Sequence, residues 1–277
     1  MFARLKHFPT GLTCLSALIM VFTSLPVTAQ DPSGEDIVKH CAYKYAGDDQ
    51  RTKLSIILRD KEGNERKNIY LRLWKAYNGK DQIEDKMVLF TQYPPDAQGA
   101  AFMRWSFVPA AGKNADQWIY LSELRKTRRV SIRDPGDSFL GSDLTYADIS
   151  PRAVDQDKHK FLKIEKKGDA EYYVVESVPK EKKPLYSKKI TWFKKTKDWS
   201  GCVTSGIIYY DPKGELLKKQ SITWQKIGDA WLWKKVEVEN VQTKHSSVFE
   251  VSEPEVNVGL GDELFTERSL KRGYSAP

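Results

Sequence analysis

Residues 118–148 contain the densest group of side chains that could carry out chemistry. Four carboxylates follow a basic cluster in this segment: Asp134, Asp137, Asp143 and Asp148. A pair of carboxylates can hydrolyse a glycosidic bond when the two are held about 5–10 Å apart and one has a raised pKa. The sequence offers no apolar setting that would raise a pKa, and the neighbouring bases would lower it. We therefore interpret five residues as structural ion-pair or docking candidates, not as catalytic groups: Arg125, Arg128, Arg129, Asp137 and Asp143.

Other signatures of catalysis and of metal binding are absent from the sequence. His40, His159 and His245 are isolated, and none lies at metal-ligand spacing from another histidine or a cysteine. There is no G-x-S-x-G nucleophile turn, and the Gly/Ser loop of the central segment lacks the lysine of a phosphate-binding loop. The sequence predicts no enzyme, no cofactor and no metal site. An exported hydrolase built on Asp137 or Asp143 is the weakest alternative.

Residues 1–29 have the features of a secretory signal peptide. Two basic residues begin it, an uncharged and mostly apolar stretch spans residues 11–25, and a small-residue cleavage site ends at Ala29. The apolar stretch is shorter than the roughly 20 residues that a membrane span needs, so an uncleaved anchor is the weaker alternative. We expect cleavage near Ala29 and export of residues 30–277 as one domain, because no break in composition marks a boundary.

The net charge of the exported chain limits the kinds of partner that it can bind. Without the signal peptide the 45 bases of the chain fall to 43 against 37 acids, which leaves a net charge of +6. This excess is mild, so we expect no nucleic-acid partner; a basic face could instead contact an anionic membrane or an acidic protein.

Cys41 and Cys202 remain after cleavage. Their even number is consistent with one disulfide in an oxidising compartment, and two buried free thiols are the alternative.

The exported part of the chain shows the alternation of apolar and polar residues that is typical of half-buried strands. Leu54, Ile56 and Leu58 alternate with polar neighbours, and similar runs separated by turn residues recur as far as residues 247–251. Helical spacing is confined to a short segment that begins near Ser33. The pattern predicts one large, curled antiparallel sheet. Its many aromatic residues could fill an ordinary core or line a pocket for an apolar ligand.

Several motifs of the chain occur together in one known family. They are Trp118–Leu121, the bases around Arg128, Ser138–Asp143 and Tyr146–Asp148, with an upstream tract at 93–103 and an ending at 262–270. Together they resemble the signature of the LolA-like outer-membrane lipoprotein-sorting family. The resemblance covers essentially all of residues 30–277.

The resemblance implies a mainly β fold, namely an open (unclosed) antiparallel half-barrel with short covering helices, similar to LolA and LolB. It implies a periplasmic, non-enzymatic carrier or chaperone that binds a lipid or lipoprotein acyl chain in an apolar cavity, for transfer toward the outer membrane. The alternative within the family is an accessory protein that docks on an inner-membrane lipid exporter of the resistance-nodulation-division type. Transient membrane contact fits either role.

Large apolar side chains of the predicted strands are the candidates for such a cavity. They are Leu71, Leu73, Met87, Leu89, Phe102, Met103, Trp105, Phe107, Trp118 and Tyr120. The face that points inward stays open, because a shift of one residue exchanges the two faces of a strand. Four loop residues are the candidates for a lid: Pro94, Pro95, Phe139 and Leu140.

Overall fold

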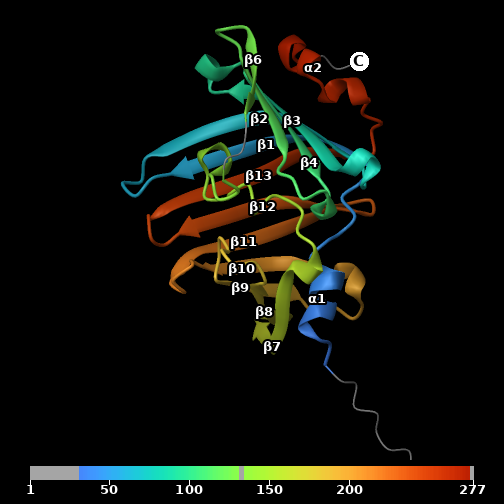
Figure 1. Cartoon of the computed structure of the whole chain (residues 1–277), viewed down its shortest axis with the longest axis vertical. Coiled ribbons are helices and arrows are strands. Elements are labelled where there is room, and N and C mark those ends of the chain that lie inside the picture. Colours follow the sequence, from blue (N-terminus) through green and yellow to red (C-terminus); the bar gives the residue numbers. More distant parts are fainter. Residues whose placement is uncertain (1–30, 131–133, 275–277) are drawn as a thin grey trace, which may run out of the picture. The chain divides into compact units, whose positions relative to one another are not determined.

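An antiparallel sheet of 13 strands is the framework of the protein (Figure 1). The structure is a computed structural model that describes residues 31–130 and 134–274, so the predicted signal peptide and its cleavage site lie outside the described residues. The strands are β1 (Asp49–Arg59), β2 (Glu65–Ala76), β3 (Ile83–Tyr93), β4 (Ala101–Phe107), β5 (Asp116–Leu121), β6 (Lys126–Val130), β7 (Asp157–Lys167), β8 (Ala170–Pro179), β9 (Lys188–Lys194), β10 (Thr204–Tyr210), β11 (Leu216–Ile227), β12 (Ala230–Asn240) and β13 (His245–Val256).

Helical structure is short in the described part of the chain. The two α-helices are α1 (Gly34–Cys41) and α2 (Glu267–Arg272). The 3-10 turns are η1 (Lys80–Gln82), η2 (Pro95–Ala97), η3 (Pro109–Ala111), η4 (Phe139–Gly141), η5 (Val154–Gln156), η6 (Trp199–Gly201) and η7 (Asp262–Phe265). Within the described residues, no helix has the length and apolar character that a membrane span requires.

The sheet is open. Its strands follow the order β6-β5-β4-β3-β2-β1-β13-β12-β11-β10-β9-β8-β7, so the first and last strands of the chain pair in the middle. Among the described residues β6 and β7 have one neighbour each, and the sheet therefore ends in two edges instead of closing. The predicted fold class, a mainly β open half-barrel with short covering helices, is confirmed.

The alternation seen in the sequence assigns each strand residue to one of two faces. Directly paired residues lie on the same face, so the register carries this assignment from strand to strand. The face that bears Ile56, which pairs with Phe249 and through it with Val236, is called the inner face here. The outer face bears Leu73, which pairs with Val88 and through it with Met103.

Three segments outside the sheet cover these faces. The C-terminal stretch around Phe265 and Leu270 packs on the outer face against β2–β5. Helix α1 packs on the inner face of β7–β9, where it contacts Tyr173 and Val175. Residues 134–150, called the covering loop from here on, pack on the inner face of the central strands (Figure 1).

Helix α1 is held at both ends. At its start the Ser33 Oγ accepts a hydrogen bond from the Asp36 backbone N–H at 3.1 Å, which satisfies one of the free N–H groups of the first turn. At its end Cys41 forms a disulfide with Cys202, which precedes β10; the two Cα atoms lie 4.9 Å apart. Because 161 residues separate the two cysteines, the bond ties the N-terminal helix to the distant half of the sheet.

Removal of the disulfide should destabilise the protein markedly. In the chain-entropy description a bond that closes a loop of 161 residues contributes about 4–5 kcal/mol. The double variant Cys41→Ser/Cys202→Ser should therefore lose several kcal/mol of unfolding free energy in urea titrations. A reducing agent should destabilise the native protein and leave the variant unchanged. Equal stability of the native protein with and without reductant would contradict this expectation.

Candidate functional site

The covering loop is a self-contained structure that lies on the inner face. The hydrogen bonds between its described backbone groups stay within the loop, for example from Phe139 N–H to the Leu144 carbonyl at 2.8 Å and from Tyr146 N–H to the Asp137 carbonyl at 3.1 Å. Gly141 adopts the left-handed conformation, with φ of 78°, and so allows the tight turn between Phe139 and Leu144. The loop is therefore attached to the strands by side-chain contacts, so it can be displaced without breaking the sheet ladder.

Apolar side chains make one part of this attachment. Phe139 and Leu144 are 4% and 1% exposed, and they pack among Leu54, Leu89 and Phe102 of the inner face. The ring of Phe139 meets the ring of Phe102 edge-on, with centroids 6.0 Å apart. Loop side chains thus occupy the apolar part of the inner face.

A buried ion pair makes the second part. Lys218 on β11 donates from Nζ to Asp148 Oδ2 at 2.5 Å and to the Asp143 carbonyl at 2.8 Å, and both ion-pair side chains are almost fully buried. Tyr186 and Thr145 also donate to the Asp148 carboxylate, at 3.0 and 2.9 Å. Burial alone would raise the pKa of Asp148, but the charges of Lys218 and Lys189, together with the hydrogen bonds from Lys218 Nζ and the Thr145 backbone N–H, hold it below its ordinary value.

The ion pair belongs to a polar row that crosses the inner face. In register the row runs His159, Ser177, Lys189, Tyr209 and Lys218. Burial lowers the pKa of Lys189 and raises that of Tyr209. The Lys218 ammonium also lies 4.7 Å from the Tyr209 ring centroid, a favourable cation–π distance.

Polar side chains of β13 and β4 hold the middle and the end of the loop. Asp143 Oδ2 accepts a hydrogen bond from Ser247 Oγ at 2.5 Å and pairs with His245 Nδ1 at 2.7 Å. Near the end of the loop, Nη1 and Nη2 of Arg104 on β4 donate to the Ile149 carbonyl at 3.2 and 3.1 Å. The loop is therefore anchored to both halves of the sheet by charged or polar side chains.

The ten cavity candidates do not share one face. The inner face bears three of them: Met87, Leu89 and Phe102. Six lie in the cluster beneath the C-terminal stretch on the outer face: Leu71, Leu73, Met103, Trp105, Trp118 and Tyr120. Phe107 is buried beneath the Lys113 ammonium, outside both clusters. The split follows from strand alternation: the residues chosen on β2 and β5 are on the outer face, those on β3 are on the inner face, and the successive residues Phe102 and Met103 of β4 lie on opposite faces.

The four lid candidates lie in two different segments. Phe139 and Leu140 lie in the covering loop and pack on the inner face. Pro94 and Pro95 lie in the β3–β4 connection, where Pro95 is exposed and begins η2. Whether either segment moves as a lid stays a prediction.

The ion-pair candidates find other partners than the sequence suggested. Arg129 pairs with Asp116 on β5, and Asp143 pairs with His245. Arg125 and Arg128 are exposed at the β6 edge, and Asp137 is exposed in the loop. Among the described residues 118–130 and 134–148, no base on β6 pairs with an acid of the covering loop, because the bases lie on an edge strand while Asp143 and Asp148 contact the central strands.

Three residues of the site were not predicted from the sequence: Lys218, Tyr186 and Arg104. The alternation along β11 does place Lys218 on the buried face with Gln220 and Ile222, which is an unusual position for a lysine. No local pattern links it to Asp148, which lies 70 residues away.

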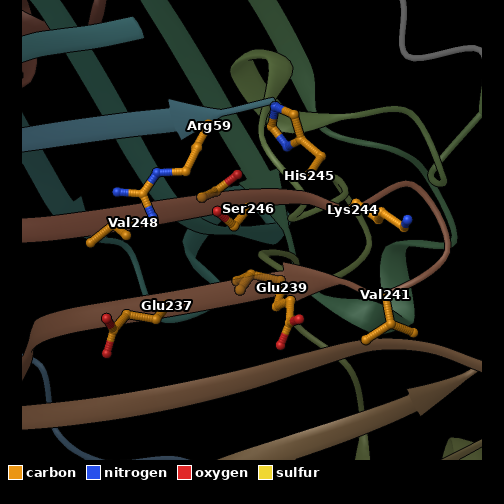
Figure 2. A pocket seen from close by; sticks show the side chains of 10 residues that line it. Arg59, Glu237, Glu239, Val241, Lys244, His245, Ser246 and Val248 are labelled. Carbon is orange, nitrogen blue, oxygen red and sulfur yellow. The ribbon is translucent and has the colours of Figure 1, made fainter. Parts of the chain in front are cut away.

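A pocket of about 600 Å³ lies at the end of β12 and β13 (Figure 2). Figure 2 shows Glu237 and Glu239 on β12, with Arg59 of β1 nearby. Glu237 is paired with Lys235 at 2.7 Å, and Arg59 is paired with Glu65. These walls are charged and open to water, so they suit an apolar ligand less well than the inner face. In residues 31–130 and 134–274, no cluster of three or more His, Cys, Asp or Glu is arranged to hold a metal ion.

Removal of Lys218 should leave a buried carboxylate without a counter-charge. Lys218→Met should therefore lower the unfolding free energy by about 3–5 kcal/mol at neutral pH. Addition of Asp148→Asn should recover part of the loss, because the unpaired charge is removed. As a control, Lys235→Met breaks an exposed, solvent-screened pair and should leave the unfolding free energy nearly unchanged. Equal losses in the single and double variants would show that the pair is uncoupled.

The Lys218–Asp148 pair should also make the unfolding free energy depend on pH. The folded state holds the pKa of Asp148 below 3.8, so its stabilisation is present above that pH and is lost as the pH falls through the folded pKa. Urea titrations from pH 6 to pH 2 should show a steeper loss for the native chain than for Asp148→Asn. Parallel curves would contradict the assignment.

The comparisons with known proteins agree with this architecture. A family model whose description reads "-like: Uncharacterized protein" matches residues 83–272. No curated protein sequence matches the chain. A crystal structure described as an outer membrane lipoprotein-sorting protein domain, from Vibrio parahaemolyticus, is 25% identical with a TM-score of 0.72 and covers 86% of this chain and 98% of its own.

Two further crystal structures share the fold. A DUF1329 family protein from Desulfovibrio piger is 24% identical with a TM-score of 0.72, covering 86% of this chain and 97% of its own. A LolA superfamily protein from Nitrosomonas europaea is 18% identical with a TM-score of 0.60, covering 86% of this chain and 99% of its own. With its open 13-stranded sheet, its covered inner face and these matches, the chain belongs to a LolA-like family.

Proposed function

We propose that the protein is a periplasmic carrier or chaperone that binds a lipid or lipoprotein acyl chain on the inner face of its sheet. The acyl chain takes the place of the covering loop, and the carrier releases it toward the outer membrane. The observation that carries this proposal is the apolar inner face, which is covered by a loop that is attached through side chains. The similar structure described as a lipoprotein-sorting domain supports it.

The energies favour exchange between loop and ligand. Each acyl CH₂ that leaves water contributes about 0.8 kcal/mol, so a chain of about a dozen carbons contributes roughly 10 kcal/mol before ordering costs. Phe139 and Leu144 are the two fully inserted apolar side chains of the loop, and their burial contributes about 1.5–3 kcal/mol each. The burial of a long acyl chain therefore contributes more than the burial of the apolar side chains of the loop. Because the loop still competes with the acyl chain for the inner face, the net affinity is modest.

The proposed role needs no chemistry. The carboxylates of the central segment act here as anchors, with Asp148 bound to Lys218 and Asp143 bound to His245. We therefore assign no catalytic residue and propose a single exported domain, residues 30–277, that contacts membranes transiently.

An accessory role is the second candidate. Arg125 and Arg128 are exposed beside β6, whose outer edge is unpaired among the described strands. A basic sheet edge can dock an acidic segment of a membrane exporter by adding a strand. In this role the inner face would stay covered.

Removal of the largest loop side chain should strengthen acyl binding. In Phe139→Ala the covered state loses roughly 1.5–3 kcal/mol of burial, so a fluorescent fatty acyl probe should bind about tenfold tighter or better. Leu124→Ala, a change at an exposed position outside the inner face, is the matched control and should leave the affinity unchanged.

Two outcomes of this titration would count against the carrier. Weaker binding by Phe139→Ala would show that the ligand does not displace the loop. If neither the native chain nor the variant binds the probe, the accessory role is favoured. Arg128→Glu should then abolish capture of an exporter from solubilised membranes.

A further inference from the structure

Gln117 on β5 is a buried amide to which the fold gives no hydrogen bond. Its side chain is 0% exposed, and neither Nε2 nor Oε1 has a partner among the described residues. The great majority of buried polar groups in folded proteins are hydrogen-bonded, so an amide with both ends unpartnered requires an explanation. Because Gln117 lies on the inner face, opposite Arg104 in the β4–β5 register, that explanation concerns the covered face.

Arg104 on β4 is the direct neighbour of this amide in the register, and Arg72 lies on the same face two strands further on, close enough to Arg104 and Asp85 for their charges to interact. Arg104 is 4% exposed, its Nε has no partner in the described part of the chain, and its Nη2 lies 3.8 Å from Asp85 Oδ1. Arg72 on β2 donates from Nη1 to Gln50 Oε1 at 2.6 Å. Burial lowers the pKa of Arg72 to about 10, partly offset by the charge of Asp85. The group therefore carries an excess positive charge in a poorly solvated place.

The strand register places this group directly beside the apolar part of the inner face. One row across the strands contains Gln50, Trp74, Met87, Arg104 and Gln117. The adjacent row contains Thr52, Arg72, Leu89, Phe102 and Ile119. Polar donors and apolar wall thus alternate within one continuous surface.

Displacement of the covering loop would take an acceptor away from this group. In the covered state the Ile149 carbonyl accepts from both terminal nitrogens of Arg104. When the loop leaves, Arg104 loses that acceptor and keeps Ser106 Oγ, while Gln117 stays next to it and Arg72 stays on the same face two strands away. Oxygens of an anion can replace the carbonyl with stronger, charge-assisted bonds, and arginine suits carboxylate and phosphate geometry.

We propose that Arg72, Arg104 and Gln117 bind the anionic head of an amphiphile, a phosphate ester or a carboxylate, whose acyl chain lies on the adjoining wall at Leu89 and Phe102. This inference rests on the proposed carrier function and specifies its ligand class. The Gln117 amide donates to the head, and the two guanidinium groups balance its charge. The covering loop occupies the same surface until the ligand arrives.

The test compares three compounds that share parts of one molecule. Oleoyl lysophosphatidic acid has both the chain and the phosphate, monooleoylglycerol has the chain alone, and glycerol 3-phosphate has the phosphate alone. Binding to the mature protein is measured by calorimetry below the micelle concentrations. The complete amphiphile should bind at least about tenfold tighter than monooleoylglycerol, and glycerol 3-phosphate should bind more weakly than either.

Gln117→Leu separates a binding role from a structural one. The change removes an unpartnered buried amide, so the melting temperature of the free protein should rise or stay level, whereas the preference for the phosphate-bearing ligand should fall. Arg104→Gln should abolish most of that preference. Arg268→Gln removes the same charge at an exposed position of α2 and is the matched control, which should keep the preference intact.

Each outcome decides a different point. If neither long-chain compound binds, the carrier function itself fails. If both bind equally, the carrier function stands and the head-group site is wrong. Glycerol 3-phosphate binding as tightly as the complete amphiphile would show a site for free phosphate esters, and unchanged preference in Gln117→Leu would remove Gln117 from the site.

Discussion

The structure depends on one constraint: the apolar inner face of an open sheet must be covered. A closed barrel would meet this constraint by wrapping the face around its own interior, but here β6 and β7 remain apart as edges. The chain instead places α1, the covering loop and polar rows on the inner face, and the C-terminal stretch on the outer face. Each covering segment is short, and α1 is held further by the disulfide to Cys202.

The means by which the loop is held explain its composition. A purely apolar attachment could slide along the face, because burial is not directional. The Lys218–Asp148 pair, the Asp143 contacts with Ser247 and the Arg104 bonds to Ile149 each demand one position. A buried ion pair contributes little net stability when compared with an apolar pair of similar size, but it is strongly unfavourable to break. We infer that these contacts determine the position of the loop on the inner face more than they determine the free energy with which it is held there.

The sequence was sufficient to predict the fold and insufficient to predict the site. Alternation in β1 and its neighbours, with turn residues between the runs, indicated the antiparallel sheet, and the central motifs indicated the open half-barrel. The inner face could not be chosen, because Leu73 and Phe102 look alike in sequence and lie on opposite faces. The contacts of Lys218 with Asp148 and of Arg104 with Ile149 join residues 70 and 45 positions apart, and local spacing carries no information about such pairs.

A filled inner face suits a carrier better than an empty cavity of the same size would. An apolar cavity as large as an acyl chain would lose packing contacts on every side, and its walls would tend to collapse. By supplying Phe139 and Leu144, the loop keeps these contacts in the unloaded state, so the ligand gains only the difference between its own burial and theirs. This difference lowers affinity without lowering selectivity for long chains, because each added CH₂ still contributes about 0.8 kcal/mol. The loop thereby also provides a route for release: its return to the inner face restores the buried ion pair and replaces the departing chain, so unloading does not expose the apolar wall to water.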